Sequence, residues 1–284
     1  MITVDFIRLC IKVSRPRFWF YLTGPFTIGC IYGASSYLDL LKPWFFLYFI
    51  YFLIIANIFL YGVNDYWDFE TDLLNPKKED KEYRVNKNER EALKKVILLI
   101  LGISIILLVF QSNFLERLIF GSFIFLSYFY SAEPLRFKDK PVLDSASNFL
   151  YVIPGLFAFY LASGEIPDDM VLLAGFLHAF AMHLFSAVPD VQFDKDTEIT
   201  TTAVLFGRNA SLFICMLAWS GLFFITINLS RSIFGFLTLI YPAMVMYLLL
   251  TKKKVLEVYW LYPYINTGLG GFMFALKAVK TPWA

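Results

Sequence analysis

The chain has 284 residues, of which 58% are hydrophobic and only 17% are charged. With a mean hydropathy of +0.62, it is too apolar for an ordinary soluble domain and is typical of a protein that crosses a membrane several times. The net charge of +2 and the scattered basic residues give no indication of nucleic-acid binding. Three cysteines, Cys10, Cys30 and Cys215, lack C-x-x-C spacing, so neither a zinc site nor a disulfide framework is indicated.

Hydrophobic runs along the chain predict an all-α polytopic membrane protein whose helices form a bundle around a central cavity. A helix needs about 20 apolar residues to cross the hydrocarbon core of a bilayer, and nine runs approach that length. We therefore expect nine spans in a single domain, residues 1–284. Their ranges are 17–38, 43–65, 91–111, 114–132, 142–163, 168–190, 209–229, 231–251 and 255–278.

The basic residues are distributed unevenly between the two sides that nine spans define. The amino terminus and the loops after spans 2, 4, 6 and 8 carry 20 Lys and Arg residues, whereas the opposite side carries 5. Lys and Arg gather on the cytoplasmic side of membrane proteins. The sequence therefore predicts a multi-pass protein of the cell membrane with a cytoplasmic amino terminus. It gives no indication of an oligomeric state.

The second predicted span ends in the acidic stretch Asn64–Asp72. If the helix continues through this stretch, Asn64, Asp68 and Asp72 lie on one face, because they are four residues apart. Carboxylates at the edge of a bilayer are costly and indicate a function. Oxygen ligands in this pattern suit Mg²⁺, which in turn suits a phosphate-bearing substrate. The alternative is that they are solvated carboxylates at a helix end, neutralised by nearby Lys and Arg.

A second acidic motif, Asp190-x-x-x-Asp194, ends the sixth predicted span. Like the first motif, it falls on the predicted cytoplasmic side. Two such motifs on one side favour metal binding over solvated charge, because membrane segments rarely carry unpaired acids. We expect the two motifs to be neighbours that hold one or two Mg²⁺ ions on a diphosphate. Asp68 and Asp190 are the predicted catalytic residues.

Basic residues follow the first acidic motif and recur in the short loop after the fourth predicted span. Lys77 and Lys81 come after the first motif, and Arg136 and Lys138 lie in the loop. A diphosphate keeps negative charge even with Mg²⁺ bound, and Arg and Lys can neutralise the remainder. The alternative is the general excess of cytoplasmic Lys and Arg, which needs no ligand.

The aspartate spacing of the two motifs resembles that of the UbiA superfamily of intramembrane prenyltransferases, and the resemblance covers nearly the whole chain. It implies that the aspartates bind Mg²⁺ and the diphosphate of an allylic isoprenoid. Lys77 and Lys81 resemble the family's basic residues after the first motif. Tyr130, with Arg136 and Lys138, resembles its Tyr-and-basic loop after span 4. The resemblance implies that these residues bind the diphosphate.

Within the superfamily, two parts of the sequence are similar to the lycopene elongase branch. They are Ser14–Trp19, and Val188–Asp190 together with Thr200–Gly207. After the second motif the chain reads Ile-Thr-Thr-Thr-Ala at 199–203, whereas many quinone-type members carry a Lys before a Ser/Thr-Thr pair. The resemblance implies transfer of a five-carbon unit from dimethylallyl diphosphate to each end of a C40 polyene.

This chemistry needs aromatic faces near the motifs, because positive charge develops on the allylic carbon. Tyr61, Tyr66 and Phe185 flank the motifs and are candidates, with helix packing as the alternative role. Asn57, seven residues before Asn64, falls near the same helix face and is a candidate for the acceptor pocket. Interhelical hydrogen bonding is the alternative for Asn57. We expect a lipophilic acceptor to enter laterally from the lipid bilayer.

Two other functions fit parts of the sequence. Prenylation of an aromatic quinone precursor or of a glycerol-phosphate lipid keeps the same chemistry, and Arg15 and Arg17 could then pair with an acidic acceptor. An ion-coupled transporter would also use carboxylates within a membrane. Transporter sites usually lie near the membrane midplane, whereas these acids end helices on one side.

Overall fold

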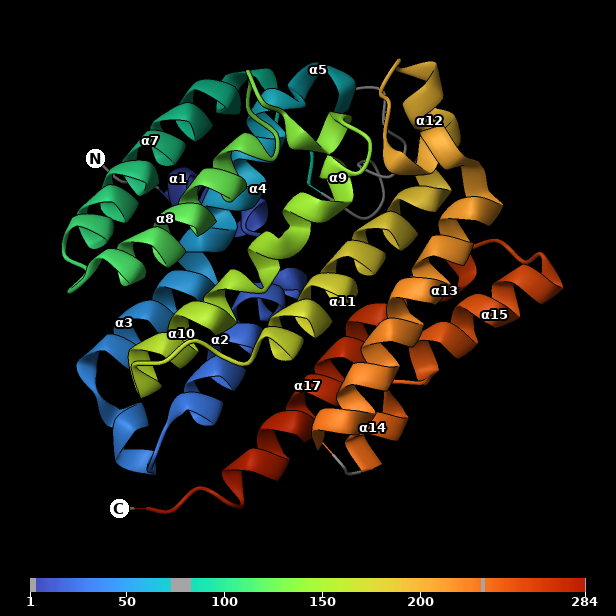
Figure 1. The fold of residues 1–284 in the computed structure, drawn as a ribbon. Helices are drawn as coiled ribbons and strands as arrows, with labels where there is room; N and C mark the ends of the chain where they lie inside the picture. Colours follow the sequence, from blue (N-terminus) through green and yellow to red (C-terminus); the bar gives the residue numbers. More distant parts are fainter. Residues whose placement is uncertain (1–3, 73–82, 231–232, 284) are drawn as a thin grey trace. The chain divides into compact units, whose positions relative to one another are not determined.

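A computed structural model describes residues 4–72, 83–230 and 233–283 (Figure 1). All regular secondary structure in these ranges is helical, which confirms the predicted all-α fold. Five of the predicted spans coincide with helical segments that are long and apolar enough to cross a membrane. These segments are Pro43–Trp67, Lys87–Val109, Leu143–Ser163, Asp169–Asp196 and Thr202–Ser230.

The other four predicted spans contain shorter helices, whose lengths range from 12 to 17 residues. They are Phe20–Gly33, Phe114–Phe129, Ile240–Thr251 and Tyr262–Ala278. Each falls short of the about 20 residues that a span typically needs. The expected number of nine spans therefore stays a prediction.

The chain divides into two compact units, and the first comprises Met1–Arg136, Ile153–Gly164 and Pro282–Ala284. Its helical elements, in chain order, are α1 (Val4–Val13), η1 (Pro16–Phe18), α2 (Phe20–Gly33), η2 (Tyr37–Leu41), α3 (Pro43–Ile50), η3 (Tyr51–Ile55), α4 (Ala56–Trp67), α5 (Phe69–Asp72), α7 (Lys87–Val109), α8 (Phe114–Phe129) and α10 (Ile153–Ser163).

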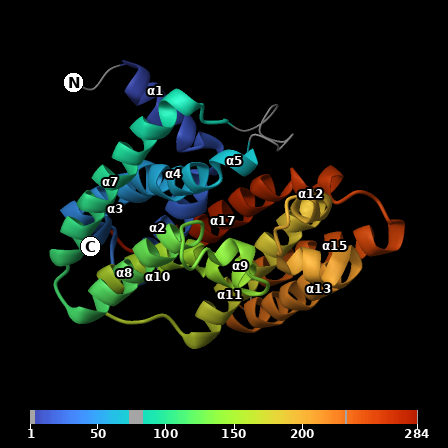
Figure 2. The same ribbon diagram turned by 90° about the horizontal axis from the view of Figure 1, so that it is seen from above.

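Helices α2 and α10 lie side by side in this unit (Figures 1 and 2), because glycines bring their backbones together. A Cβ atom added to Gly29 would stand 2.1 Å from the carbonyl oxygen of Gly155, and one added to Gly33 would stand 2.6 Å from that of Phe159. In a lipid bilayer the hydrophobic effect does not drive helices together, so close backbone packing at small residues stabilises the contact instead.

The segment that carries the first motif passes through a wider, π-helical turn, η3, between α3 and α4. Inside a bilayer, backbone groups released from the regular α-helical pattern need another partner. The buried Asn57 supplies one, since its Nδ2 donates to the carbonyl oxygens of Phe52 at 2.8 Å and Leu53 at 3.0 Å. Asn57 therefore bonds within its own helix, in contrast to the interhelical bonding considered from the sequence.

Aromatic side chains fill the core of the first unit. Phe52, Phe120 and Phe157 are fully buried, with ring centroids 5.2 Å apart for Phe120 and Phe157 and 6.3 Å apart for Phe52 and Phe157. Tyr51 shares a 2.8 Å hydrogen bond with Ser104 of α7. These contacts fix the helix of the first motif against α7, α8 and α10.

The second unit comprises Phe137–Val152 and Glu165–Thr281. In it, α13 packs along α11 and against α15 (Figure 2). Its elements, in chain order, are η4 (Phe137–Asp139), α9 (Leu143–Ala146), η5 (Ser147–Tyr151), α11 (Asp169–Ala187), η6 (Val188–Asp190), α12 (Val191–Asp196), α13 (Thr202–Ser230), α14 (Ile233–Leu237), α15 (Ile240–Thr251), α16 (Leu256–Tyr259) and α17 (Tyr262–Ala278).

A stack of buried aromatic rings forms the centre of this second unit. Trp219 of α13 stacks on Tyr241 at 5.4 Å and on Tyr262 at 5.3 Å between ring centroids. Phe185 of α11 lies 4.6 Å from Tyr262 and is fully buried. This packing fixes the end of α11, from which the chain continues to Asp190.

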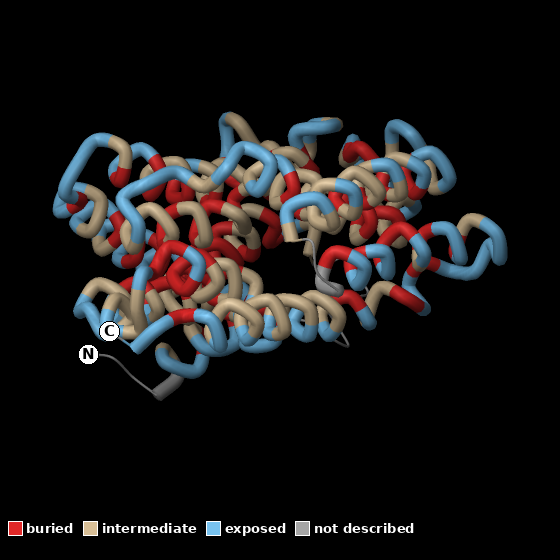
Figure 3. The backbone as a smooth tube through the Cα atoms, turned by 60° about the horizontal axis from the view of Figure 1, so that its bottom comes forward, coloured by how far each residue is buried: buried red, intermediate tan, exposed pale blue. Residues whose placement is uncertain are grey.

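Many large apolar side chains are exposed; Figure 3 colours the exposed positions of the chain pale blue. Phe110 and Leu250, for example, are 80% and 76% exposed. An apolar surface of this extent is unfavourable in water, but lipid tails solvate it well. The surface therefore agrees with the membrane protein that the composition predicts.

Candidate active site

The first acidic motif lies where α4 ends. Asp68 leaves the helical conformation, with φ −93° and ψ 8°, and α5 begins at Phe69. Helical hydrogen bonds continue across the break, because the N–H of Asp68 donates to Asn64 O at 2.9 Å and that of Asp72 donates to Asp68 O at 2.8 Å. The break therefore leaves the four-residue spacing of the motif intact.

Asn64 and Asp68 contact each other directly. The Nδ2 of Asn64 donates to Oδ2 of Asp68 at 2.8 Å and to Oγ of Ser131 at 3.0 Å. These two bonds use both amide hydrogens of Asn64 and leave its carbonyl oxygen as the atom that can bind a cation. Ser131, which the sequence gave no reason to single out, thus orients a predicted metal ligand.

Arg136 binds the same carboxylate from the other side. Its Nη2 donates to Oδ1 of Asp68 at 3.0 Å, and its Nη1 donates to the carbonyl oxygen of Ser131 at 3.3 Å. Asp68 is 6% exposed, so this ion pair compensates a charge that burial would otherwise make costly. Tyr130, at the end of α8, is half-buried at the start of the same loop.

A second ion pair joins Arg15 to Asp65, which lies within the first acidic stretch. Arg15 donates to Oδ1 of Asp65 at 2.8 Å, and its guanidinium lies 4.7 Å from the centre of the Tyr61 ring. Tyr61 is buried and also contacts Phe18. Arg15 therefore binds the protein's own carboxylate, and one face of Tyr61 is occupied by that guanidinium.

Arg90 of α7 contacts side chains of the first acidic stretch. Its guanidinium lies 5.1 Å from the ring of Tyr66, 4.8 Å from that of Phe69 and 3.7 Å from a carboxylate oxygen of Glu70. A cavity of about 400 Å³ opens beside α5 at this place. Its lining residues are Phe69, Glu70, Arg84, Val85, Asn86 and Lys87.

The second acidic motif lies in the second unit. Asp190 ends η6, and Asp194 follows one helical turn later in α12; both side chains are half-buried. Oδ2 of Asp194 accepts a hydrogen bond from Oγ1 of Thr201 at 3.3 Å. Lys138 is half-exposed in η4 of this unit.

Four other predicted site residues lie apart from these groups or outside the described ranges. Phe185 is enclosed in the aromatic stack of the second unit, and Asn57 is bonded to its own helix. Lys77 and Lys81 lie outside the described residues. The described candidate residues therefore form two separate groups: Asn64, Asp68 and Arg136 in the first unit, and Asp190 with Asp194 in the second.

The donor atoms of these groups fit a hard divalent cation. Among the described residues, no three Asp, Glu, His or Cys side chains gather closely enough to hold a metal alone. Mg²⁺ does not require that, because it commonly takes one or two carboxylates, with water and substrate phosphate as its other ligands. Paired Asn and Asp oxygens beside an Arg suit such a phosphate-bound ion.

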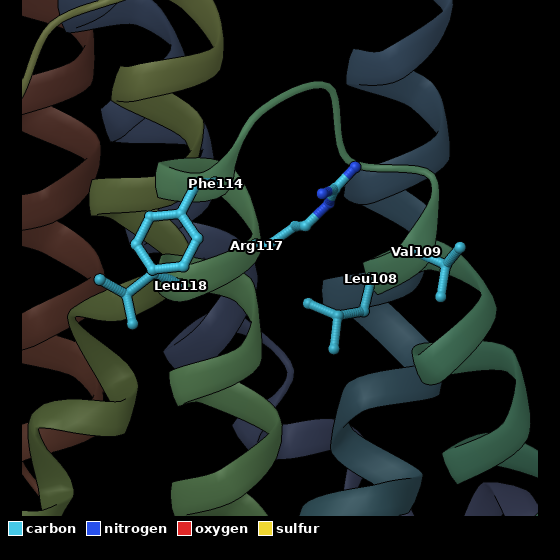
Figure 4. A pocket seen from close by; sticks show the side chains of 5 residues that line it. All are labelled: Leu108, Val109, Phe114, Arg117 and Leu118. Carbon is cyan, nitrogen blue, oxygen red and sulfur yellow. The ribbon is translucent and has the colours of Figure 1, made fainter.

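A larger surface cavity, of about 490 Å³, opens at the turn between α7 and α8 (Figure 4). Arg117 reaches toward this turn, and its Nη2 donates to the carbonyl oxygen of Gln111 at 3.0 Å. The cavity lies at the start of α8, about 24 Å along that helix from Tyr130 at 1.5 Å per residue. It is therefore separate from the candidate site. Its lining residues are Leu108, Val109, Phe114, Arg117 and Leu118.

The apolar helices indicate a membrane protein. Two of them lead into acidic motifs, and an aspartate of the first motif is paired with an arginine. Such helix ends can hold an anion that carries a bound metal ion. The chain belongs to the UbiA prenyltransferase family, which matches residues 22–263. It is therefore an enzyme, a prenyltransferase of the membrane.

Two similar proteins come from haloarchaea. The lycopene elongase/hydratase of Halobacterium salinarum is 38% identical over 271 residues, which cover 95% of this chain and 96% of that protein. The lycopene elongase/hydratase of Haloarcula japonica is 37% identical over 269 residues, which cover 95% of this chain and 90% of that protein. These similarities confirm the resemblance to the lycopene elongase branch.

Among solved structures, the fold is similar to that of a UbiA homolog from Archaeoglobus fulgidus bound to dimethylallyl diphosphate (DMAPP) and Mg²⁺. The two share a TM-score of 0.67 and 20% sequence identity, over 95% of this chain and 99% of that chain. This likeness confirms the polytopic helical fold.

Proposed function

We propose that this prenyltransferase moves a five-carbon group from dimethylallyl diphosphate to the ends of lycopene or a related long polyene, with Mg²⁺ as cofactor. The reaction takes place on the cytoplasmic side of the cell membrane. The two haloarchaeal relatives, 37% and 38% identical, support the acceptor. The A. fulgidus structure, which is bound to DMAPP and Mg²⁺, supports the donor and the cofactor. The uneven distribution of Lys and Arg supports the cytoplasmic side.

The group formed by Asn64, Asp68 and Arg136 is the observation on which the chemistry rests. It combines oxygen atoms that suit Mg²⁺ with a guanidinium that suits phosphate. The guanidinium lies 3.0 Å from Oδ1 of Asp68. The alternative, that these are solvated carboxylates at a helix end, does not explain why Asp68 is buried and bonded to both Asn64 and Arg136.

The metal would be held by oxygen atoms of both acidic motifs. These ligands are Asn64, Asp68, Asp72, Asp190 and Asp194. Bound Mg²⁺ supplies positive charge that offsets the negative charge growing on the departing diphosphate. Because Ser131 fixes Asn64, and Asn64 with Arg136 fixes Asp68, these ligand atoms need little reorganisation during the reaction.

Arg136 neutralises charge that remains on the diphosphate. A guanidinium has five N–H donors, so Arg136 can keep its bonds to Asp68 and Ser131 and still donate to a diphosphate oxygen. The bond between the allylic carbon and the diphosphate oxygen breaks, and a terminal double bond of the polyene attacks that carbon. Loss of a proton, or capture of water, then completes the product.

Aromatic rings near the first motif can stabilise the positive charge of the allylic group. Tyr61 and Tyr66 each have one ring face against a guanidinium, from Arg15 and Arg90 respectively. The lipophilic acceptor would reach the site from the bilayer, in which lycopene is soluble.

The proposal is tested by supplying membranes that contain the protein with dimethylallyl diphosphate, lycopene and Mg²⁺. Chromatography with mass detection should reveal C45 and C50 products, which disappear when EDTA removes the metal. Parallel reactions receive a hydroxybenzoate or a dihydroxynaphthoate as acceptor. Prenylated rings in place of elongated carotenoids would contradict the proposed acceptor, and no product on any acceptor would contradict prenyl transfer from this donor.

The two arginines considered from the sequence give no support for the other acceptors. Arg15, considered from the sequence as a partner for an acidic acceptor, is bound to Asp65. Arg17 is exposed, with its guanidinium 4.6 Å from the ring of Phe18. Neither arginine offers a prepared site for the carboxylate of a ring or the phosphate of a glycerol lipid.

A further inference from the structure

Asp144 of α9 is a carboxylate to which neither the sequence motifs nor the proposed reaction gives a role. It is completely buried in the second unit, where a carboxylate is stable only if its oxygens are fully bonded. Oδ1 accepts from the N–H of Ser145 at 2.7 Å and from the hydroxyl of Thr202, while Oδ2 accepts from the N–H of Thr202 at 2.8 Å. Nε2 of His183 lies 4.0 Å from Oδ2.

Thr202 is the residue on which this buried network converges. Besides donating to Asp144, its Oγ1 accepts from the N–H of Val142 at 2.6 Å. Val142 has φ 69°, a conformation that a β-branched residue rarely adopts unless its surroundings hold it there. The network therefore joins α9 tightly to the start of α13.

Thr201, the neighbour of Thr202, connects the network to the second acidic motif. Its Oγ1 donates to Oδ2 of Asp194 at 3.3 Å and accepts from the N–H of Val204 at 3.3 Å. Consecutive residues thus face two carboxylates: Thr202 binds the buried Asp144, and Thr201 binds the predicted ligand Asp194. Because Thr202 is fixed by Asp144, the position of the Thr201 hydroxyl is fixed as well.

We propose that Asp144 is a positioning residue for the second acidic motif, which acts through Thr202 and Thr201 to orient the carboxylate of Asp194. This assignment rests on the proposed role of Asp194 as a ligand of the divalent cation. Hydrogen bonds of this kind to a metal ligand commonly change metal affinity 10- to 100-fold.

Binding of Mn²⁺ in the presence of dimethylallyl diphosphate, without acceptor, tests the assignment on the full chain in detergent. Electron paramagnetic resonance measures free Mn²⁺, so the readout does not depend on turnover. Thr201→Val removes the hydroxyl at nearly constant shape, and Thr201→Ser restores it. Thr200→Val, at the exposed neighbouring position, is the matched control, and Asp194→Asn shows the effect of altering the ligand itself.

We expect Thr201→Val and Asp144→Asn each to weaken Mn²⁺ binding about tenfold, with Thr201→Ser and Thr200→Val close to wild type. Thermal unfolding of every variant is measured in parallel. If Asp144→Asn does not fold, Thr201→Val and Thr201→Ser still decide the outcome. Wild-type affinity in Thr201→Val would overturn the assignment, as would wild-type affinity in a folded Asp144→Asn.

The same experiment separates this inference from the proposed function. If the wild-type protein binds no Mn²⁺ with dimethylallyl diphosphate, the proposed metal-dependent reaction itself fails. If wild type binds Mn²⁺, Asp194→Asn weakens it and Thr201→Val leaves it unchanged, only the positioning role of Asp144 fails.

Discussion

Arg136 combines an unusual backbone with a functional contact. Its φ of 41° lies in the left-handed region, which costs a residue other than glycine on the order of 1–3 kcal/mol and persists only where the surroundings hold it. The bonds to Asp68 and to the carbonyl oxygen of Ser131 hold it here. A general excess of cytoplasmic positive charge requires no such geometry, so we interpret Arg136 as a residue of the site.

We expect Arg136→Gln to lower the rate of prenyl transfer about 100-fold, because one charged donor to the leaving group is lost. Arg136→Lys should recover only part of the rate, since an ammonium cannot reproduce the planar fork of a guanidinium. Initial rates at saturating dimethylallyl diphosphate measure the effect. Arg117→Gln, at the far end of α8, is the matched control and should retain the wild-type rate. An unchanged rate in Arg136→Gln would refute this role.

The pair formed by Arg15 and Asp65 should stabilise the fold more than it serves the reaction. Their side chains are 12% and 2% exposed, and removing one partner leaves the other charge buried. We expect Asp65→Asn to lower the free energy of unfolding by about 3 kcal/mol. The double variant with Arg15→Gln should lose less than the sum of the single changes. Denaturant unfolding in micelles, followed by circular dichroism, measures both; additive losses would exclude the coupling.

Among the elements, the long helices could be predicted because each is a single apolar run, but their interruptions could not. The run at 142–163 was expected to be one span, and the structure divides it into α9, η5 and α10. Placing Asn64, Asp68 and Asp72 on one face depended on a helix that continues through Asp68, where the structure has a break that keeps the spacing. Such breaks depend on tertiary contacts, to which a local apolar pattern is insensitive.

The same reason explains which parts of the site could be predicted. Asn64 and Asp68 were found together because they are one helical turn apart. The bonds from Arg136 to Asp68 and from Thr202 to Asp144 join residues 68 and 58 positions apart in the chain. No local pattern encodes such pairs, so Arg136 could be predicted only as one of several basic residues, and Asp144 was missed.

The close packing of α2 against α10 gives a testable prediction. A Cβ atom on Gly29 would stand 2.1 Å from a backbone oxygen of α10, whereas one on Gly24 meets nothing within 4 Å. Both glycines lie in α2, so they form a matched pair. We expect Gly29→Ala to destabilise the protein by at least about 1–3 kcal/mol and Gly24→Ala to be neutral or slightly stabilising. Thermal unfolding of both variants in detergent measures this; equal unfolding temperatures would contradict the close packing of α2 and α10.

The whole molecule is an apolar helical enzyme whose predicted chemistry depends on charges at helix ends. A ligand that binds only the folded state raises its stability by mass action, by about 2.7 kcal/mol at a concentration of 100 Kd. We expect Mg²⁺ and dimethylallyl diphosphate together to raise the unfolding temperature, with little effect from either alone. EDTA should reverse the increase. An increase with the diphosphate that EDTA leaves unchanged would exclude a metal-dependent complex.

The most direct test of the reaction measures C45 and C50 products formed from lycopene by wild type, Asp68→Ala and Asp190→Ala. Each variant changes one of the two acidic motifs, and the unfolding temperature of each confirms that it is folded. We predict that both variants are folded and that neither forms product. Turnover near the wild-type rate in either folded variant would contradict the proposal that both acidic motifs are needed for prenyl transfer.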